Sequence, residues 1–343
     1  MDTQIITNPS DQELDMLARA LRNGELVSIP TETVYGLGAN GLDPEAMDKI
    51  YTAKGRPSDN PLILHVPNSE SIKPLVTEVS NTAQLLMDTF WPGPLTITLP
   101  KSDLVPNRAT GGLPRVALRC PDHELCRALL ERAGVPIAAP SANISGRPSP
   151  TTAQDVYHDM KDRISYILDA GSCTIGVEST VVEVHDDKVI ILRPGGITKA
   201  QLEAVVSTVE YDTALVNATT KPKAPGMKYT HYAPDAPMTV VVGSPEDVAS
   251  TFKELSAEVE GLIGCLVSHE TYNLIKGDTR FICHCFGHHS DALSLGHDFY
   301  KSLLHFNENH VTLILAEGVD DDGFGVAIMN RMEKASSHHI IYK

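Results

Sequence analysis

The chain has 343 residues, 42% of them hydrophobic, which is enough to bury a substantial core and to form two domains. Its formal charge is −16, and acidic residues outnumber basic ones in both halves. This balance argues against strong direct binding to nucleic acid, which depends on neutralising phosphates. No apolar run approaches the roughly 18 residues that span a membrane, and the N-terminal residues lack the basic and apolar regions of a signal peptide. We therefore expect a cytoplasmic protein without membrane association.

The N-terminal part of the chain mixes helices and strands. A helix is predicted over residues 10–23, where Ser10 and Glu13 form a capping box. A second helix starts at Asp43-Pro44 and ends near Lys54. Further strands are predicted at 26–30, 62–66, 96–99, 116–119, 177–184 and 189–192, and further helices before Trp91, at 123–132 and at 152–160. Close hairpins together with crossovers favour an open, twisted, mixed sheet in an α/β fold.

Three predicted strand ends carry polar loops of similar build. An apolar run from Val135 to Ala139 stops at Pro140 and is followed by small polar residues up to Pro150. Residues 28–40 repeat this design, and so do residues 176–184 followed by 191–196. Loops at the carboxyl ends of strands are common ligand sites in α/β proteins. Their Ser, Thr, Asn and Arg residues predict a pocket for an anionic, oxygen-rich ligand.

Four cations accompany these loops. Lys54 and Arg56 stand where the second helix ends, and they suit phosphates or carboxylates, although cations there also stabilise the helix dipole. Arg119 and Arg193 end otherwise apolar strands, where an arginine is costly unless it meets an anion. Two acids, Glu32 and Glu178, precede a Thr or Ser within a site loop. They could act as an acid–base pair, but we favour a structural role in which the carboxylates bind backbone amides.

The cysteines give no clear metal signature. The six cysteines contain no CxxC pair, which favours reduced thiols. The stretch FICHCFGHH places Cys283, His284, Cys285, His288 and His289 close together in sequence. No second ligand pair at zinc-finger spacing follows it, so we favour buried thiols beside surface imidazoles over a metal site.

The chain changes character after residue 208. Residues 209–237 are rich in proline and read as an extended linker. Residues 238–343 alternate strands and helices and predict a small doubly wound, Rossmann-like α/β domain without a glycine-rich phosphate loop. We therefore divide the chain into a catalytic domain (1–208), a linker that could close over the site as a lid (209–237) and a C-terminal domain (238–343).

Six motifs occur in order within about residues 10–205 and resemble the YrdC-like family. They are PTETVYGLGAN, AKGRPSDNPLILHV, WPGPLTITL, APSANISGRPSPT, GVESTV and ILRPGGI. The following APGMKYTHYAP resembles the linker of the two-domain branch, the threonylcarbamoyl-AMP synthases of tRNA modification.

This resemblance implies a nucleotidyltransferase. Such an enzyme joins L-threonine, bicarbonate or CO2, and ATP with its Mg²⁺ into L-threonylcarbamoyladenylate and pyrophosphate. A partner tRNA-modifying threonylcarbamoyl transferase complex then acts on the adenosine beside the anticodon. Positioning and charge neutralisation would supply most of the catalysis.

The resemblance also implies the site residues, without any metal ligands from the protein. Lys54 and Arg56 would be the catalytic cations. The threonine side would comprise Thr33, His65, Arg119, Ala139 and Ser179. The ATP side would comprise Lys54, Arg56, Asn60, Arg115, Ser141, Asn143, Ser149, Arg193 and, from the linker, Tyr232.

Two other functions remain open at this point. Folds of this kind can present a concave basic surface to double-stranded RNA or tRNA, although the acidic charge argues against that role. Carbamoyl-adenylate enzymes of the hydrogenase-maturation type share the domain, but they carry further modules upstream of it. We expect Tyr232→Ala to reduce activity without reducing stability if the linker acts as a lid.

Overall fold

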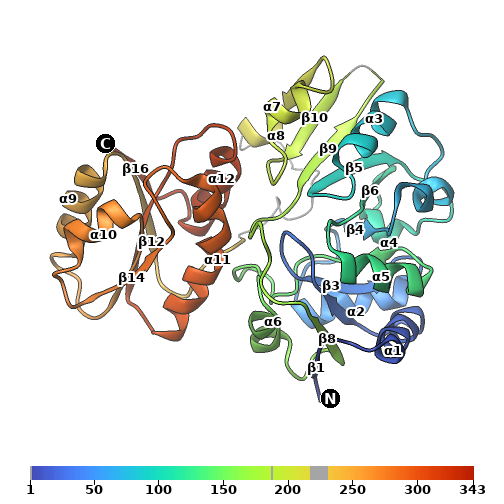
Figure 1. Cartoon of the computed structure of the whole chain (residues 1–343), viewed down its shortest axis with the longest axis horizontal. Helices are drawn as coiled ribbons and strands as arrows, with labels where there is room; N and C mark the ends of the chain where they lie inside the picture. The colour runs from blue at the N-terminus through green and yellow to red at the C-terminus, as the bar shows by residue number, and fades with distance from the viewer. Residues whose placement is uncertain (1, 187, 217–230) are drawn as a thin grey trace. The chain divides into compact units, whose positions relative to one another are not determined.

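The computed structural model describes residues 2–186, 188–216 and 231–343 (Figure 1). It divides into two compact units. The first comprises Met1–Ser145, Ser149–Thr174 and Glu178–Tyr229, and the second comprises Gly146–Pro148, Ile175–Val177 and Thr230–Lys343. Most of the predicted lid, residues 217–230, lies outside the described residues.

The first unit is built on one mixed sheet of eleven strands, in the order β1-β8-β2-β3-β7-β4-β6-β5-β9-β10-β11. The sheet contains both parallel pairs, such as β4 with β6, and antiparallel pairs, such as β5 with β6, which confirms the predicted mixed sheet. The strands are β1 (Gln4–Thr7), β2 (Val27–Ile29), β3 (Gly36–Asn40), β4 (Ile63–His65), β5 (Leu95–Pro100), β6 (Arg115–Arg119), β7 (Ile137–Ala138), β8 (Tyr166–Asp169), β9 (Thr180–Val184), β10 (Val189–Arg193) and β11 (Val209–Tyr211).

Helices cover both faces of this sheet. Successive residues of a strand point to opposite faces, and Ala138 packs in one core while Ile137 and Ala139 pack in the other. The helices are α1 (Asp11–Arg22), α2 (Pro44–Lys54), the 3-10 helix η1 (Ser69–Leu75), α3 (Asn81–Phe90), α4 (Asn107–Thr110), α5 (Glu124–Ala133), α6 (Ala153–Met160), α7 (Lys199–Glu203) and α8 (Thr213–Val216). One core contains apolar residues of α1 and α5, and the larger core contains those of α2, α3 and α6.

Local capping signals set the helix ends. Ser10 and Glu13 form the predicted capping box of α1. Asp43 caps α2 ahead of Pro44, and Gly55 ends the helix in the left-handed conformation with φ 61°. The C-terminal end of α2, which carries Lys54, is therefore determined by residues next to it in sequence.

Strands at the edges of the sheet were not all predicted. Residues 209–211, which we assigned to the linker, form β11 and pair in parallel with β10. Strands β1 and β8 also pair in parallel at the other edge. These strands have three or four residues each, too few for a periodic pattern, and their pairing depends on partners far away in sequence.

The second unit contains a five-stranded, fully parallel sheet in the order β14-β13-β15-β12-β16. Its strands are β12 (Met238–Val242), β13 (Ile263–Val267), β14 (Phe281–Cys285), β15 (Leu313–Glu317) and β16 (Ile340–Tyr342). Helices α9 (Pro245–Ser256) and α10 (His269–Ile275) lie on one side of it and α11 (Ala292–Glu308) and α12 (Gly325–Ala335) on the other (Figure 1). The doubly wound prediction is confirmed. No helix of the described ranges is long and apolar enough to cross a membrane.

Candidate active site

The order of the strands in the sheet places predicted site residues at neighbouring strand ends. Strands β4 and β6 run in parallel, and their last residues, His65 and Arg119, are register partners. Strand β5 runs antiparallel to β6, so Gly93, just before β5, lies beside the end of β6 and accepts a hydrogen bond from Arg119 Nε at 3.3 Å. Strand β9 runs antiparallel to β10, which places Ser179 beside Arg193.

Three of the residues predicted to bind threonine form one buried group: Thr33, His65 and Arg119. Arg119 Nη1 donates to Thr33 Oγ1 at 2.9 Å, and its Nη2 lies 2.7 Å from Oε1 of Glu32. Burial, together with the Arg119 charge, lowers the pKa of His65 to about 3. The imidazole is therefore neutral near pH 7 and can serve a hydroxyl without adding charge.

Ser179 and Ala139 complete the predicted threonine side in different ways. The Ser179 hydroxyl lies 2.8 Å from that of Thr96 and accepts from Arg193 Nη2 at 3.2 Å. Arg193 also donates to the Ser179 carbonyl, at 2.9 Å from Nη2. Ser179 is thus joined to the predicted ATP side. The amide of Ala139 donates to the Ile63 carbonyl at 3.0 Å, so this backbone group already has a partner.

Lys54 reaches the loop that follows β7. Its Nζ donates to the carbonyls of Ser141 at 2.5 Å and Asn143 at 2.6 Å, and its own carbonyl accepts from the Ser145 amide. Burial, and then the neighbouring Arg56 charge, lower the pKa of Lys54 well below its ordinary value. The geometry shows Lys54 shaping the Ser141–Asn143 loop, a role that its position at a helix end did not reveal.

Asn60 is a fully buried side chain whose amide has no hydrogen-bond partner among the described residues. Its backbone carbonyl accepts a hydrogen bond from the Tyr51 hydroxyl at 2.8 Å. Arg56 lies close by and donates from Nη2 to the Pro61 carbonyl at 3.4 Å. A buried amide without partners costs free energy, which indicates a place where a ligand completes the hydrogen bonds.

The two acids of the site loops have side-chain partners. Glu178 accepts from the hydroxyl of Ser149 at 2.7 Å, and Glu32 pairs with Arg119. For Glu32, no backbone amide of the described residues donates to the carboxylate, so the expected role is not met there. The partners lie 29 and 87 residues away along the chain, so no local motif could have identified them.

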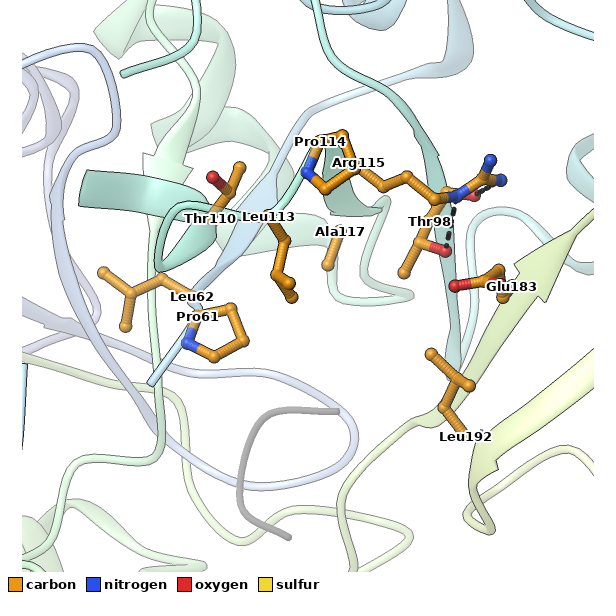
Figure 2. Close-up of a pocket in the computed structure, with 10 residues that line it drawn as sticks. All are labelled: Pro61, Leu62, Thr98, Thr110, Leu113, Pro114, Arg115, Ala117, Glu183 and Leu192. Atoms are coloured by element: carbon orange, nitrogen blue, oxygen red, sulfur yellow. Dashed lines mark hydrogen bonds between the residues drawn. The ribbon is translucent and has the colours of Figure 1, made fainter. Parts of the chain in front are cut away.

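Arg115 lines an apolar pocket of about 260 Å³ in the first unit (Figure 2). Its Nη2 donates to the carbonyls of Thr98 at 2.8 Å and Val184 at 2.6 Å. Figure 2 shows Pro61 and Leu113 on one side of the pocket and Leu192 on the other. The remaining lining residues are Leu62, Thr98, Thr110, Pro114, Ala117 and Glu183. The sequence motifs indicate Arg115 but not the apolar walls of this pocket.

Tyr232 belongs to the second unit. It is buried, with φ 67°, and its ring lies 5.3 Å from that of Tyr300 and 6.0 Å from the guanidinium of Arg331. Removing such a buried ring costs about 3–5 kcal/mol. From this burial we now expect Tyr232→Ala to lower stability, contrary to the expectation from the sequence.

The cysteine-rich stretch of the second unit lies on β14, where Cys283 is the register partner of Cys265 on β13. His288 and His289 pair with the carboxylates of Glu270 and Glu317. Within the described ranges, no group of three or more His, Cys, Asp or Glu residues is arranged to hold a metal ion.

Comparison with known proteins assigns the chain to a family. Residues 19–195 match the Sua5, YciO and YrdC family model, described as "Telomere recombination", and residues 197–337 match "Threonylcarbamoyl-AMP synthase, C-terminal domain". The chain therefore belongs to the YrdC-like family, in its two-domain form.

Relatives with this two-domain organisation cover nearly the whole chain. The chain is 46% identical to a threonylcarbamoyl-AMP synthase of Bacillus subtilis, over 97% of this chain and 95% of the relative. It is 43% identical to one of Pyrococcus abyssi, over 96% and 95%. The crystal structure of Pyrococcus abyssi Sua5 complexed with L-threonine matches with a TM-score of 0.92 and 42% identity, covering 99% of this chain and 100% of that chain.

Proposed function

We propose that the first unit synthesises L-threonylcarbamoyladenylate and pyrophosphate from L-threonine, ATP and bicarbonate or CO2. The observation that carries the proposal is the buried group of Arg119, Thr33 and His65. It offers a guanidinium for a carboxylate and neutral groups for a hydroxyl, which are the functional groups of threonine. The same reaction class belongs to the full-length relatives, and no observation favours an RNA-binding module or a hydrogenase-maturation enzyme.

The threonine subsite would consist of Thr33, His65, Arg119, Ser179 and the backbone at Ala139. Arg119 binds the carboxylate because its five N–H groups exceed its protein partners. His65, neutral at physiological pH, and the Thr33 hydroxyl face the substrate hydroxyl. A site that hydrogen-bonds a hydroxyl rejects valine strongly and serine less so.

The nucleotide subsite would extend from this group along the neighbouring loops. Arg56 and Arg193 meet the phosphates, and Lys54 adds charge while it holds the loop after β7. The amide of Asn60 and the apolar pocket beside Arg115 suit a flat heteroaromatic base. The other proposed nucleotide contacts of this unit come from Ser141, Asn143 and Ser149.

Mg²⁺ would enter with ATP. The described residues supply no metal-binding cluster, so the nucleotide phosphates and water would hold the ion. When bound, the ion would supply neutralisation of phosphate charge.

The product is a mixed anhydride that must be consumed by a group-transfer enzyme. We place the protein in the cytoplasm, where a threonylcarbamoyl transferase complex acts on tRNA. Direct tight binding of tRNA to this acidic chain is not expected.

Product analysis tests the proposal. The full chain is incubated with ATP, Mg²⁺, L-threonine and labelled bicarbonate, and the labelled adenylate and pyrophosphate are measured. Both should depend on threonine and fall sharply in Arg119→Gln. A folded wild-type protein that makes no threonine-dependent adenylate contradicts the proposal. Pyrophosphate without labelled adenylate would point to ATP hydrolysis instead.

A further inference from the structure

Glu32 is a buried carboxylate in the loop between β2 and β3, 6% exposed. Its Oε1 lies 2.7 Å from Arg119 Nη2, but neither carboxylate oxygen has a hydrogen bond of good geometry among the described residues. The adjacent Thr31 ties the loop together, because its Oγ1 accepts from the Thr33 and Val34 amides and donates to the Val34 carbonyl at 2.6 Å. Loop closure therefore does not explain the presence of Glu32.

A buried carboxylate with unused acceptor positions is costly. Two carboxylate oxygens offer about four lone-pair positions, and one ion pair leaves most of them unused. Buried charges are tolerated when they are paired and hydrogen-bonded, and a half-satisfied ion pair is unfavourable. The unused acceptors therefore indicate a ligand with N–H donors and positive charge.

The position of Glu32 matches the charge pattern of a free amino acid. An α-amino acid at neutral pH carries a carboxylate and an ammonium group two bonds apart, joined through one carbon. Glu32 and Arg119 present a negative and a positive group in direct contact. The Arg119 guanidinium also contacts Thr33, the residue after Glu32, so the three side chains lie close together.

We propose that Glu32 binds the α-ammonium group of the substrate threonine while Arg119 binds its carboxylate. This inference rests on the proposed function and adds a specificity residue to it. The negative Glu32 then faces the positive ammonium group, and the positive Arg119 faces the negative carboxylate. The ammonium N–H groups donate to the unused acceptor positions of Glu32. Glu32 therefore selects amino acids over hydroxy acids, whereas Thr33 and His65 select for the hydroxyl.

Ligand pairs that differ by one group can test this role. The full chain, as wild type and as Glu32→Gln, is titrated calorimetrically with L-threonine and with 3-hydroxybutanoate, which lacks only the amine. We expect Glu32→Gln to weaken L-threonine binding at least tenfold and to change 3-hydroxybutanoate binding less than twofold. In kinetics, the KM for threonine should rise while the KM for ATP stays within twofold. Glu178→Gln, which alters the other loop carboxylate, is the matched control and should leave the preference for threonine over 3-hydroxybutanoate unchanged.

Other outcomes separate the possible errors. If Glu32→Gln weakens both ligands equally, Glu32 only positions Arg119 and the proposal is wrong; an unchanged affinity for threonine also refutes it. If the wild-type protein does not bind threonine, the proposed function itself fails. Should thermal unfolding show that Glu32→Gln is not folded, Glu32→Asp replaces it. The aspartate keeps the charge but is shorter, so it should weaken threonine binding and spare 3-hydroxybutanoate.

Discussion

Two buried glutamates, Glu317 in the second unit and Glu32 in the first, differ in how far their own unit satisfies their carboxylates. In the second unit, Glu317 at the end of β15 accepts from the Ser268 amide at 2.8 Å, and its other oxygen lies 2.7 Å from Nδ1 of His289. In the first unit, Glu32 has its ion pair with Arg119 and no hydrogen bond of good geometry among the described residues. Buried charge alone therefore does not mark a site. A buried polar group whose hydrogen-bonding capacity is not met within the protein does indicate a site.

The buried asparagines show the same contrast. Oδ1 of Asn307 in the second unit accepts from the Asp235 amide at 2.9 Å, and only its Nδ2 lacks a partner among the described residues. Both polar atoms of the Asn60 side chain lack a partner within the described ranges. Asn60 thus keeps both polar side-chain atoms in reserve, whereas Asn307 uses its Oδ1 to hold the Asp235 amide. Each prediction below tests this difference.

The largest effect is expected from Arg119→Ala. We expect kcat/KM for threonine to fall roughly 100-fold through loss of charge-assisted contacts, and stability to fall by about 3–5 kcal/mol because Glu32 remains buried without a counter-charge. Steady-state kinetics and urea unfolding measure the two effects. Combining the change with Glu32→Gln should restore part of the stability but none of the activity. Recovery of activity in the double variant would remove Arg119 from the substrate site.

A pH effect is expected from His65. Its pKa is lowered from 6.5 to about 3 in the folded protein, so the unfolded chain binds one more proton between these values. This contribution to stability is fully present above pH 6.5 and is lost as the pH falls toward 3. The slope is up to about 1.4 kcal/mol per pH unit. In His65→Gln this part of the slope should disappear in urea unfolding between pH 6.5 and pH 4. Identical slopes in the two proteins would mean that His65 is not buried in its neutral form.

A stability effect without a substrate effect is expected from Glu317→Gln. The change removes the charge that faces the Ser268 amide and His289, and it should cost about 1–3 kcal/mol. The KM for threonine should stay within twofold of the wild-type value. A large rise in that KM at a temperature where the variant is fully folded would give Glu317 a part in catalysis and weaken the contrast.

The smallest effect on stability is expected from Asn60→Leu. Because the amide makes no hydrogen bond within the described residues, its removal should leave stability unchanged or raise it by up to about 1 kcal/mol. The KM for ATP should rise about tenfold, the effect of losing one or two ligand hydrogen bonds.

Asn307→Leu is the matched control for that change. It leaves the Asp235 amide unpaired and should destabilise the protein by about 1–3 kcal/mol. Equal destabilisation by the two substitutions would show that Asn60 is as well satisfied in the free protein as Asn307.

The sequence by itself determined the features that depend on near neighbours. The capping box of Ser10 and Glu13, the Asp43-Pro44 start of α2 and its end at Gly55 were all predicted and are present. The sequence also indicated that polar loops follow apolar strands, and the ordered motifs indicated the family. Each of these signals lies within a few residues, where local backbone geometry decides the outcome.

Only the tertiary structure decided the partners of the buried polar groups. The register of β4 with β6 puts His65 beside Arg119, and the position of β5 adds Gly93. Lys54 was expected to face a phosphate, but the structure places two carbonyls of a loop almost ninety residues away around its Nζ. The partners of a buried charge follow from strand order, which depends on pairing between distant segments. Capping and hydrophobic periodicity contain no information on that order.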